Sequence, residues 1–480
     1  MADAVSAHRA TPEVRRIPQR VMLAYGFGAA AYGVKDLGFA TFLLLFYNQV
    51  IGLPSAEVGF VIMCALLLDA FIDPAIGFLS DRTRSRWGRR HPWMYAAALP
   101  IVAGWLLLWN PPALGHQAML LWVFATAVIV RTAVSAYEVP SQALTPELSA
   151  DYDERTRTMA YRYLFGWAGG MVMMALAYGV FLTDVLDRDG YPGFALAGAT
   201  AILIAILVSA IGTHSEIARL PRAEIVSRKR FRDNLAELGE TVRNRAFLTL
   251  MGAGICYYSA QGINFALSNY LYAHVWRFAG GAYQALALVL FTGVSIAFVI
   301  APRIGRRWGK PRSAMVFMIA AALLLALPYL LRIAGLFPDP SSPAMLPVLF
   351  GIFAVNTACG VSSTILGASM MADVVEHSEI ETGRRSEGVF FAGAFFVQKC
   401  TSGLGIFGAG LILALVGFPA KAEPGKVAPG TIDALTIAYI ATYAALGFAA
   451  AAFYRRFPFG KAEHLAHLEQ LRAEEMPAGN

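Results

Sequence analysis

Charged residues are scarce in this 480-residue chain. Asp, Glu, Lys and Arg make up 15% of it and apolar residues 57%, whereas ordinary soluble domains are about 25% charged. A soluble protein of this length needs more polar surface, so the composition argues against one. The apolar residues also come in blocks, as at 92–109 and 432–454, that approach or reach the ~20 residues that a membrane-spanning helix needs. The composition therefore predicts an all-α membrane protein with many spans.

Motifs typical of several other protein classes are missing. The four cysteines include no CxxC pair, and there is no HExxH, GxSxG or nucleotide-binding loop, so we expect no disulfide framework, no zinc site, no cofactor and no enzyme activity. Residues 1–20 are polar and lack the short apolar core of a cleavable signal peptide. The net charge of +7 gathers in loops, so we expect no nucleic-acid partner. We expect the protein to be a monomer whose partners are membrane lipids and a small-molecule solute.

Twelve membrane spans are predicted from the apolar blocks and from the Pro and Gly clusters that end them. They cover about 21–53, 55–79, 92–110, 117–145, 158–182, 192–213, 246–276, 281–301, 314–333, 344–371, 387–418 and 432–454. Lys and Arg alternate between the connecting segments: the N-terminus has four, 80–91 five, 214–245 eight, 302–313 five and the tail four. The positive-inside rule then places both termini in the cytoplasm of a multi-pass plasma (inner) membrane protein.

A short motif recurs at the equivalent point of two halves. SRWGRRHPW follows the second span and GRRWGKPRS the eighth, and Trp87 and Trp308 lie 221 residues apart. The repeat predicts two pseudo-symmetric six-helix bundles, 1–213 and 246–454, with a cytoplasmic middle loop, 214–245, and a cytoplasmic tail, 455–480. Within the middle loop, an apolar face predicts a short surface helix at 228–244.

Eight charged residues lie in the interior of the predicted spans, away from their ends, where a charge at mid-bilayer costs roughly 2.5–3.5 kcal/mol. Their four acids and four bases balance, which indicates an interior network of Lys35, Asp36, Asp69, Asp73, Arg131, Glu138, Arg162 and Lys399. Asp69 and Asp73 are four residues apart and share a helix face, so at least one needs a proton, a cation or a basic partner. With the Ser135 hydroxyl they would make an oxygen-rich site that suits H⁺ or Na⁺. Static ion pairs between helices are the alternative for any one of these residues.

Four stretches of the chain resemble the glycoside–pentoside–hexuronide:cation symporters, the melibiose-permease-like family of the major facilitator superfamily. They are YGVKDLGFATFLLLFYNQVIGL, DAFIDPAIGFLSDRTRSRWGRRHPW, ELSADYDERTRTMAYR and GRRSEGVFFAGAFFVQK. The resemblance covers nearly all twelve spans and implies the major facilitator fold. It also implies that Asp69, Asp73 and Ser135 bind the coupling cation. The solute site that it implies consists of Lys35, Asp36, Glu138, Arg162 and Lys399.

Three positions depart from the family pattern. Ile72 stands where an asparagine aids sodium binding, which leaves H⁺ and Na⁺ both open as coupling ions. Gln142 stands where a tryptophan stacks on the sugar ring, which argues against a galactoside. Arg131 has no counterpart. It either pairs with Asp69 or Asp73, the option that we favour, or binds an anionic solute such as a uronate.

The DRTRSRWGRR loop resembles the cytoplasmic gate motif of the family. We expect its charged residues to form ion pairs that break as the halves rock. Matching contacts between the halves are expected from residues outside the loop. The predicted gate residues are Asp81, Arg82, Arg84, Arg86 and Arg89 in the loop, with Arg155 and Arg385 elsewhere. Retention of a basic loop in the cytoplasm is the simpler role for the same residues.

The leading interpretation is a secondary active symporter of a sugar, a glycoside or a related small polar solute, coupled to H⁺ or Na⁺ and working by alternating access. Arg131, Gln142, Tyr257 and Gln261 complete the predicted solute site, the last two from the seventh span. A carrier of a lysophospholipid or another amphipathic solute on the same fold is the alternative.

Overall fold

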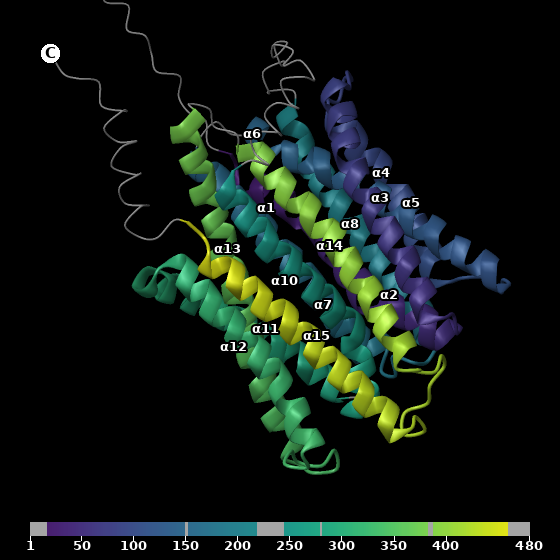
Figure 1. The fold of residues 1–480 in the computed structure, drawn as a ribbon. Helices are drawn as coiled ribbons and strands as arrows, with labels where there is room; N and C mark the ends of the chain where they lie inside the picture. Colours follow the sequence, from purple (N-terminus) through teal and green to yellow (C-terminus); the bar gives the residue numbers. More distant parts are fainter. Residues whose placement is uncertain (1–16, 149–151, 218–243, 279–280, 383–386, 459–480) are drawn as a thin grey trace, which may run out of the picture.

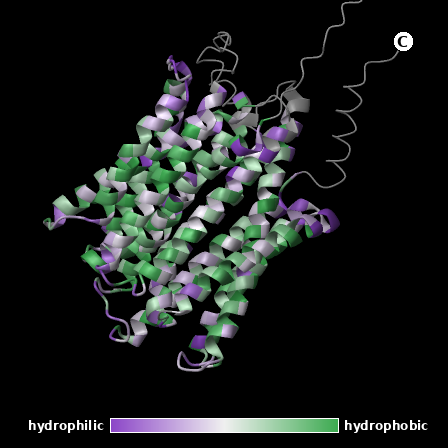
Figure 2. Cartoon of the chain, turned by 180° about the vertical axis from the view of Figure 1, so that it is seen from behind, coloured by the Kyte–Doolittle hydropathy of each residue, from purple (hydrophilic) through white to green (hydrophobic). Residues whose placement is uncertain are grey.

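The computed structural model describes residues 17–148, 152–217, 244–278, 281–382 and 387–458, and these residues form an all-helical bundle (Figure 1). Eleven of the helices in these ranges are long and apolar enough to cross a membrane. Apolar residues dominate the middle of the helices, and polar residues gather at their ends and in the connections (Figure 2). The prediction of an all-α membrane fold is confirmed.

Each of the twelve predicted spans coincides with one helix or with consecutive helical segments. In chain order the elements are α1 (Gln19–Phe27), α2 (Ala29–Leu45), η1 (Phe46–Ile51), α3 (Ser55–Arg82), α4 (His91–Trp109), α5 (His116–Ala143), α6 (Thr145–Leu148), α7 (Tyr152–Leu176), η2 (Ala177–Phe181), α8 (Gly190–Ile217), α10 (Arg245–Tyr270), η3 (Leu271–Val275), α11 (Gly281–Trp308), α12 (Lys310–Ile333), α13 (Met345–Thr382), α14 (Glu387–Leu415) and α15 (Pro429–Arg455). The η segments are π-helical turns that end the first, fifth and seventh spans. α10 falls outside the eleven apolar helices because it carries polar residues such as Gln261, Asn264 and Asn269.

The repeated motif marks a tight turn at the same place in each half. Gly88 and Gly309, each directly after the repeated tryptophan, have φ of 73° and 86°, a region that a side chain disfavours. The segment 302–313 is helical on both sides of Gly309, so the loop predicted there is much shorter than expected, because α11 and α12 continue beyond the apolar blocks. The helix predicted at 228–244 falls almost wholly outside the described residues.

The two halves meet along four helices near the middle of the bundle, two from each half. α3 packs along α14, and α10 packs against both α14 and α2. Small residues permit this approach: a methyl group added at Gly410 would lie 2.4 Å from the carbonyl oxygen of Ser55, and the Ser55 hydroxyl donates to the Gly410 carbonyl at 3.0 Å. Such close contact of backbones is how helices associate where the solvent is as apolar as the side chains.

The largest apolar core joins both halves at one end of the bundle. It includes Phe46, Tyr47 and Trp109 from the first half and Tyr270 and Phe418 from the second. A second core, at the other end, consists of residues from the second half alone. We call the first end the η1 end, after the π-helical turn η1, and the second the motif end, after the repeated motif.

Candidate functional site

Asp69 lies at the centre of a buried polar cluster formed by α3, α5 and α14. Its Oδ1 accepts a hydrogen bond from the Ser135 hydroxyl at 2.9 Å. Its Oδ2 lies 3.2 Å from Nε and 3.1 Å from Nη2 of Arg131, and 3.0 Å from Nζ of Lys399. Asp69, Arg131 and Ser135 are at most 5% exposed. The structure thus brings together residues predicted from three separate spans. Of the two roles predicted for Arg131, the structure shows the ion pair with Asp69.

Lys399 links Asp69 to Asp73, one turn further along α3. The Lys399 Nζ lies 2.5 Å from Asp73 Oδ2, and the two side chains are 20% and 28% exposed. Asp73 Oδ1 is buried without a hydrogen-bond partner among the described residues. Because α3 belongs to the first half and α14 to the second, the Lys399 ammonium is a charged link between them. The two aspartates therefore share the Lys399 ammonium, and Asp69 has the Arg131 guanidinium as a second cationic partner.

A second polar cluster follows the same face of α5 towards the motif end. Glu138 Oε1 lies 2.5 Å from Nη2 of Arg162 and accepts from Nε2 of Gln142 at 2.9 Å. Arg162 also donates to the Ser141 hydroxyl at 2.8 Å, so α5 and α7 are tied together. Arg162 is buried and Gln142 is exposed, which gives the cluster one accessible side.

Lys35 and Asp36 of α2 differ sharply in exposure. Lys35 is 3% exposed and lies over the Tyr32 ring, with 4.3 Å between its Nζ and the ring centroid. The Asp36 side chain is 52% exposed, with 3.4 Å between Asp36 Oδ1 and Lys35 Nζ. A carboxylate in the middle of a membrane-spanning helix needs water or a polar partner. Asp36 therefore has Lys35 as its polar partner and an open side beside the buried clusters.

The second half contributes polar groups without charge. The Tyr257 hydroxyl accepts from Nε2 of Gln261 at 3.0 Å, and the Thr364 hydroxyl donates to it at 2.7 Å. One turn further along α10, Asn264 Oδ1 accepts from the Tyr439 hydroxyl at 2.6 Å. Tyr257 and Gln261 thus belong to a neutral cluster of their own, apart from the charged residues of α3 and α5.

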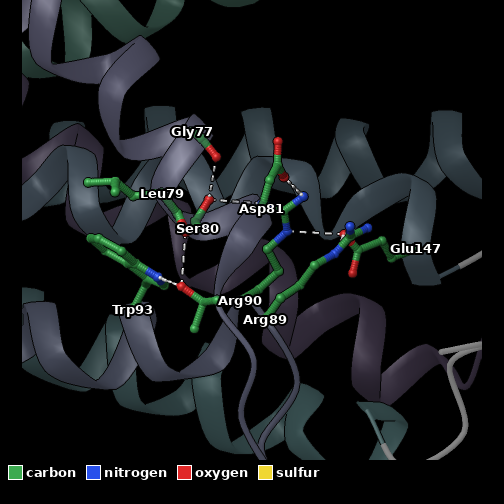
Figure 3. A network of polar contacts seen from close by, with 9 residues as sticks. Gly77, Leu79, Ser80, Asp81, Arg89, Arg90, Trp93 and Glu147 are labelled. Atoms are coloured by element: carbon green, nitrogen blue, oxygen red, sulfur yellow. Dashed lines mark hydrogen bonds and ion pairs between the residues drawn. The ribbon is translucent and has the colours of Figure 1, made fainter. Parts of the chain in front are cut away.

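The charged loop at the motif end forms a network within the first half (Figure 3). Arg90 is buried and contacts Asp81 at 2.5 Å, the Ser80 hydroxyl at 2.9 Å and Glu147 at 3.0 Å, and Arg89 contacts the same Glu147 oxygen at 2.6 Å. Arg89 and Asp81 are predicted from the sequence as gate residues, whereas Arg90 and Glu147 are not. The one available signal is that Arg89 and Arg90 are consecutive residues in a turn. Their side chains point in different directions, so one of them can point inward.

Among the other predicted gate residues, the three that the structure describes, Arg82, Arg84 and Arg86, form no ion pair between the halves. Arg82 lies over the Phe78 ring and Arg86 over the Trp87 ring, at 3.5 and 5.4 Å from guanidinium carbon to centroid, and Arg84 is exposed. The side chain of Arg155 and the whole of Arg385 lie outside the described residues. In the second half, Lys310, two residues after Trp308, contacts Asp373 at 2.6 Å, as Arg89, two residues after Trp87, contacts Glu147. These pairs therefore brace each half rather than join the two.

Hydrogen bonds between the halves gather instead at the η1 end. The Gln49 amide donates to the Pro419 carbonyl at 3.0 Å and accepts from the Ala422 amide at 2.8 Å. The Tyr270 hydroxyl donates to Asn48 Oδ1 at 2.9 Å. Asn269 donates to the Thr41 carbonyl at 3.2 Å and accepts from the Tyr178 hydroxyl at 2.8 Å. We call Asn48, Gln49, Asn269 and Tyr270 the polar seal; sequence reasoning missed all four, since neutral polar residues near helix ends carry no distinctive signal.

Comparison with known proteins places this arrangement in a family. The model of the MFS/sugar transport protein family matches residues 24–461. An uncharacterized symporter of Synechocystis is 26% identical over 93% of this chain and 96% of its own length, and the isoprimeverose transporter of Lactiplantibacillus pentosus is 24% identical over 96% and 93%. A sodium-dependent lysophosphatidylcholine symporter of Danio rerio is 22% identical over 82% and 77%.

Solved structures support the fold. The nucleoside transporter NupG superimposes with a TM-score of 0.63 over 91% of this chain and 99% of its own, at 14% identity, a likeness that concerns the fold alone. The resemblance to the glycoside–pentoside–hexuronide:cation symporters is confirmed by the family match and by the symporters among the relatives. The chain is a multi-pass membrane protein that belongs to the MFS/sugar transport protein family, a family of transporters and not of enzymes.

Proposed function

We propose that this protein is a secondary active carrier that moves a sugar, a glycoside or a related small polar solute across the plasma (inner) membrane by alternating access, coupled to a cation. The observation that carries the proposal is the placement of charge. Eight Asp, Glu, Lys and Arg residues lie in the interior of the spans, away from their ends, and Asp36 is half exposed in mid-helix, which is how membrane proteins mark a solute or ion pathway.

The clusters suggest a division of roles. The exposed Asp36 and Gln142, with Glu138 and Arg162 behind them, offer carboxylate, amide and guanidinium groups of the kind that hydrogen-bond hydroxyls or a uronate. Asp69, Asp73 and Lys399 lie at the contact of α3 with α14, so a change of charge there would alter the attraction between the halves. Coupling is proposed to act through this contact. The proposed orientation places both termini in the cytoplasm.

The relatives narrow the solute class. One is named for isoprimeverose, and others are named a putative glycoside/cation symporter and a glucuronide carrier homolog. A lysophospholipid is the second candidate, because a relative is named for lysophosphatidylcholine and because Gln142 provides no aromatic platform for a sugar ring.

Uptake into proteoliposomes tests the proposal. Purified protein would be offered a panel of pentosides, hexosides, hexuronides and lysophospholipids under an imposed inward cation gradient. We expect accumulation of at least one small polar solute, and loss of that accumulation in the Glu138→Gln variant, with Thr200→Val on the exposed face of α8 as the matched control. Accumulation of lysophospholipids alone would favour the second candidate, and accumulation of nothing on the panel would contradict both.

A further inference from the structure

The charged cluster of Asp69, Asp73, Arg131 and Lys399 is neutral without a metal ion, and three of its four carboxylate oxygens are already bound, Asp73 Oδ1 being the exception among the described residues. Asp69 and Asp73 supply two negative charges, and Arg131 and Lys399 supply two positive charges within 3.2 Å of them. The other charged residues in the interior of the spans, Lys35 with Asp36 and Arg162 with Glu138, balance as pairs. An added cation would therefore carry an uncompensated charge into the membrane interior, which is costly.

The oxygen atoms of Asp69 are also fully used. A carboxylate has about four lone-pair positions, and Asp69 accepts from the Ser135 hydroxyl, from Nε and Nη2 of Arg131 and from Nζ of Lys399. Ile72, between the two aspartates, adds no oxygen. Within the described residues, no group of three or more His, Cys, Asp or Glu side chains could hold a metal ion. The residues present do not fit Na⁺, which binds through several oxygen atoms at once.

Arg131 is held in this position from several sides. Its guanidinium lies 5.3 Å from the centroid of the Phe39 ring of α2 and makes two contacts with Asp69 of α3. The side chain is 5% exposed. An arginine stays protonated in proteins, so its charge cannot be discharged as that of a lysine can. Lys399, by contrast, is 20% exposed and divides its ammonium between two carboxylates.

We infer that Arg131 is a tethered counter-cation that occupies the place of a sodium ion, and that this carrier therefore neither binds nor needs Na⁺. This inference rests on the proposed function for its physiological meaning, because it assigns the coupling to a cation other than Na⁺. It also gives the buried arginine beside Asp69 a role: the carboxylate keeps one permanently charged partner while Lys399 remains available to Asp73.

Thermal unfolding of the purified protein tests this inference without a solute. Melting temperatures would be measured in NaCl and in choline chloride at equal ionic strength for the wild type, Arg131→Gln and Arg131→Lys. We expect no Na⁺ effect in the wild type. In Arg131→Gln the cluster has one uncompensated negative charge and a new amide oxygen, so we expect a saturable rise of the melting temperature with Na⁺. Arg131→Lys keeps the charge and should show no rise.

A saturable Na⁺ effect in the wild type would overturn the inference, as would a folded Arg131→Gln variant without one. If Arg131→Gln does not fold, the wild type and Arg131→Lys still decide. In the uptake assay we expect Na⁺ to stimulate transport by Arg131→Gln by about fivefold or more, the lower end of coupling between two ligands, and wild-type transport not at all. Failure of the proposed function would appear as absence of uptake under every gradient, whatever the thermal result.

Discussion

The two ends of the bundle hold their helices together in different ways. At the η1 end, neutral hydrogen bonds of the polar seal and a shared apolar core join the first half to the second. At the motif end, the ion pairs Arg90–Glu147 and Lys310–Asp373 each stay within one half. A neutral hydrogen bond contributes only about 0.5–1.5 kcal/mol. The difference indicates that each half is a braced unit, and that the hydrogen bonds between the halves at the η1 end are individually weak enough to exchange.

The largest effect is expected at the charged link between the two halves. Asp69→Asn leaves Arg131 buried without its carboxylate and removes one partner of Lys399, so we expect a loss of about 3–5 kcal/mol of unfolding free energy and loss of uptake. Thermal unfolding and the proteoliposome assay measure both. Asp36→Asn is the control for stability, because this side chain is 52% exposed; an equal loss of stability there would contradict the account.

Breaking the ion pairs at the motif end should lower the free energy of unfolding by less. Arg90→Ala removes a buried guanidinium that contacts Ser80, Asp81 and Glu147, and we expect a loss of about 3 kcal/mol. Arg89→Ala, whose side chain is 32% exposed, should cost at most about 1 kcal/mol. Equal effects of the two neighbours in thermal unfolding would show that the pairs do not brace the half in the way described.

A smaller effect is expected at the polar seal. Gln49→Ala leaves the Pro419 carbonyl and the Ala422 amide without their partner, and we expect a cost of about 2 kcal/mol, together with greater access to the η1 end. Alkylation of a cysteine introduced at Asn264 would measure that access. Gln284→Ala, on a weaker contact of 3.4 Å with Gly179, should leave the alkylation rate unchanged; faster alkylation in both variants would argue against a specific seal.

The smallest effect concerns the turn of the repeated motif. Gly88→Ala forces a side chain into a left-handed conformation at φ 73°, which costs about 1 kcal/mol. Gly351→Ala in α13 meets no neighbour within 4 Å of the added carbon and should be neutral or slightly stabilising in the same thermal measurement. If Gly88→Ala proved neutral as well, the glycine of the motif would have no conformational role.

The sequence was sufficient to predict the spans and the composition of the charged cluster, because long apolar blocks and misplaced charges are strong signals in a membrane protein. The sequence left open whether Arg131 pairs with an aspartate of the second span or binds an anionic solute. The geometry shows an ion pair between Arg131 and Asp69. Neither Arg90 nor the polar seal could be found in this way. An arginine in a basic loop and an asparagine near a helix end have no pattern that tells which partner they face, since their contacts are set by helices distant in the chain.

The central claim is that the two halves rock so that the η1 end and the motif end open alternately. Distances measured across each end test it most directly. In a cysteine-free background, spin labels at Asp189 and Pro424 would report the distance across the η1 end, and labels at Arg86 and Arg307 the distance across the motif end. We expect a short distance at the η1 end without solute, and a second population with a transported solute in which the η1 end is longer and the motif end shorter. Distances that change in the same direction at both ends, or at neither end, would contradict alternating access by the two braced halves.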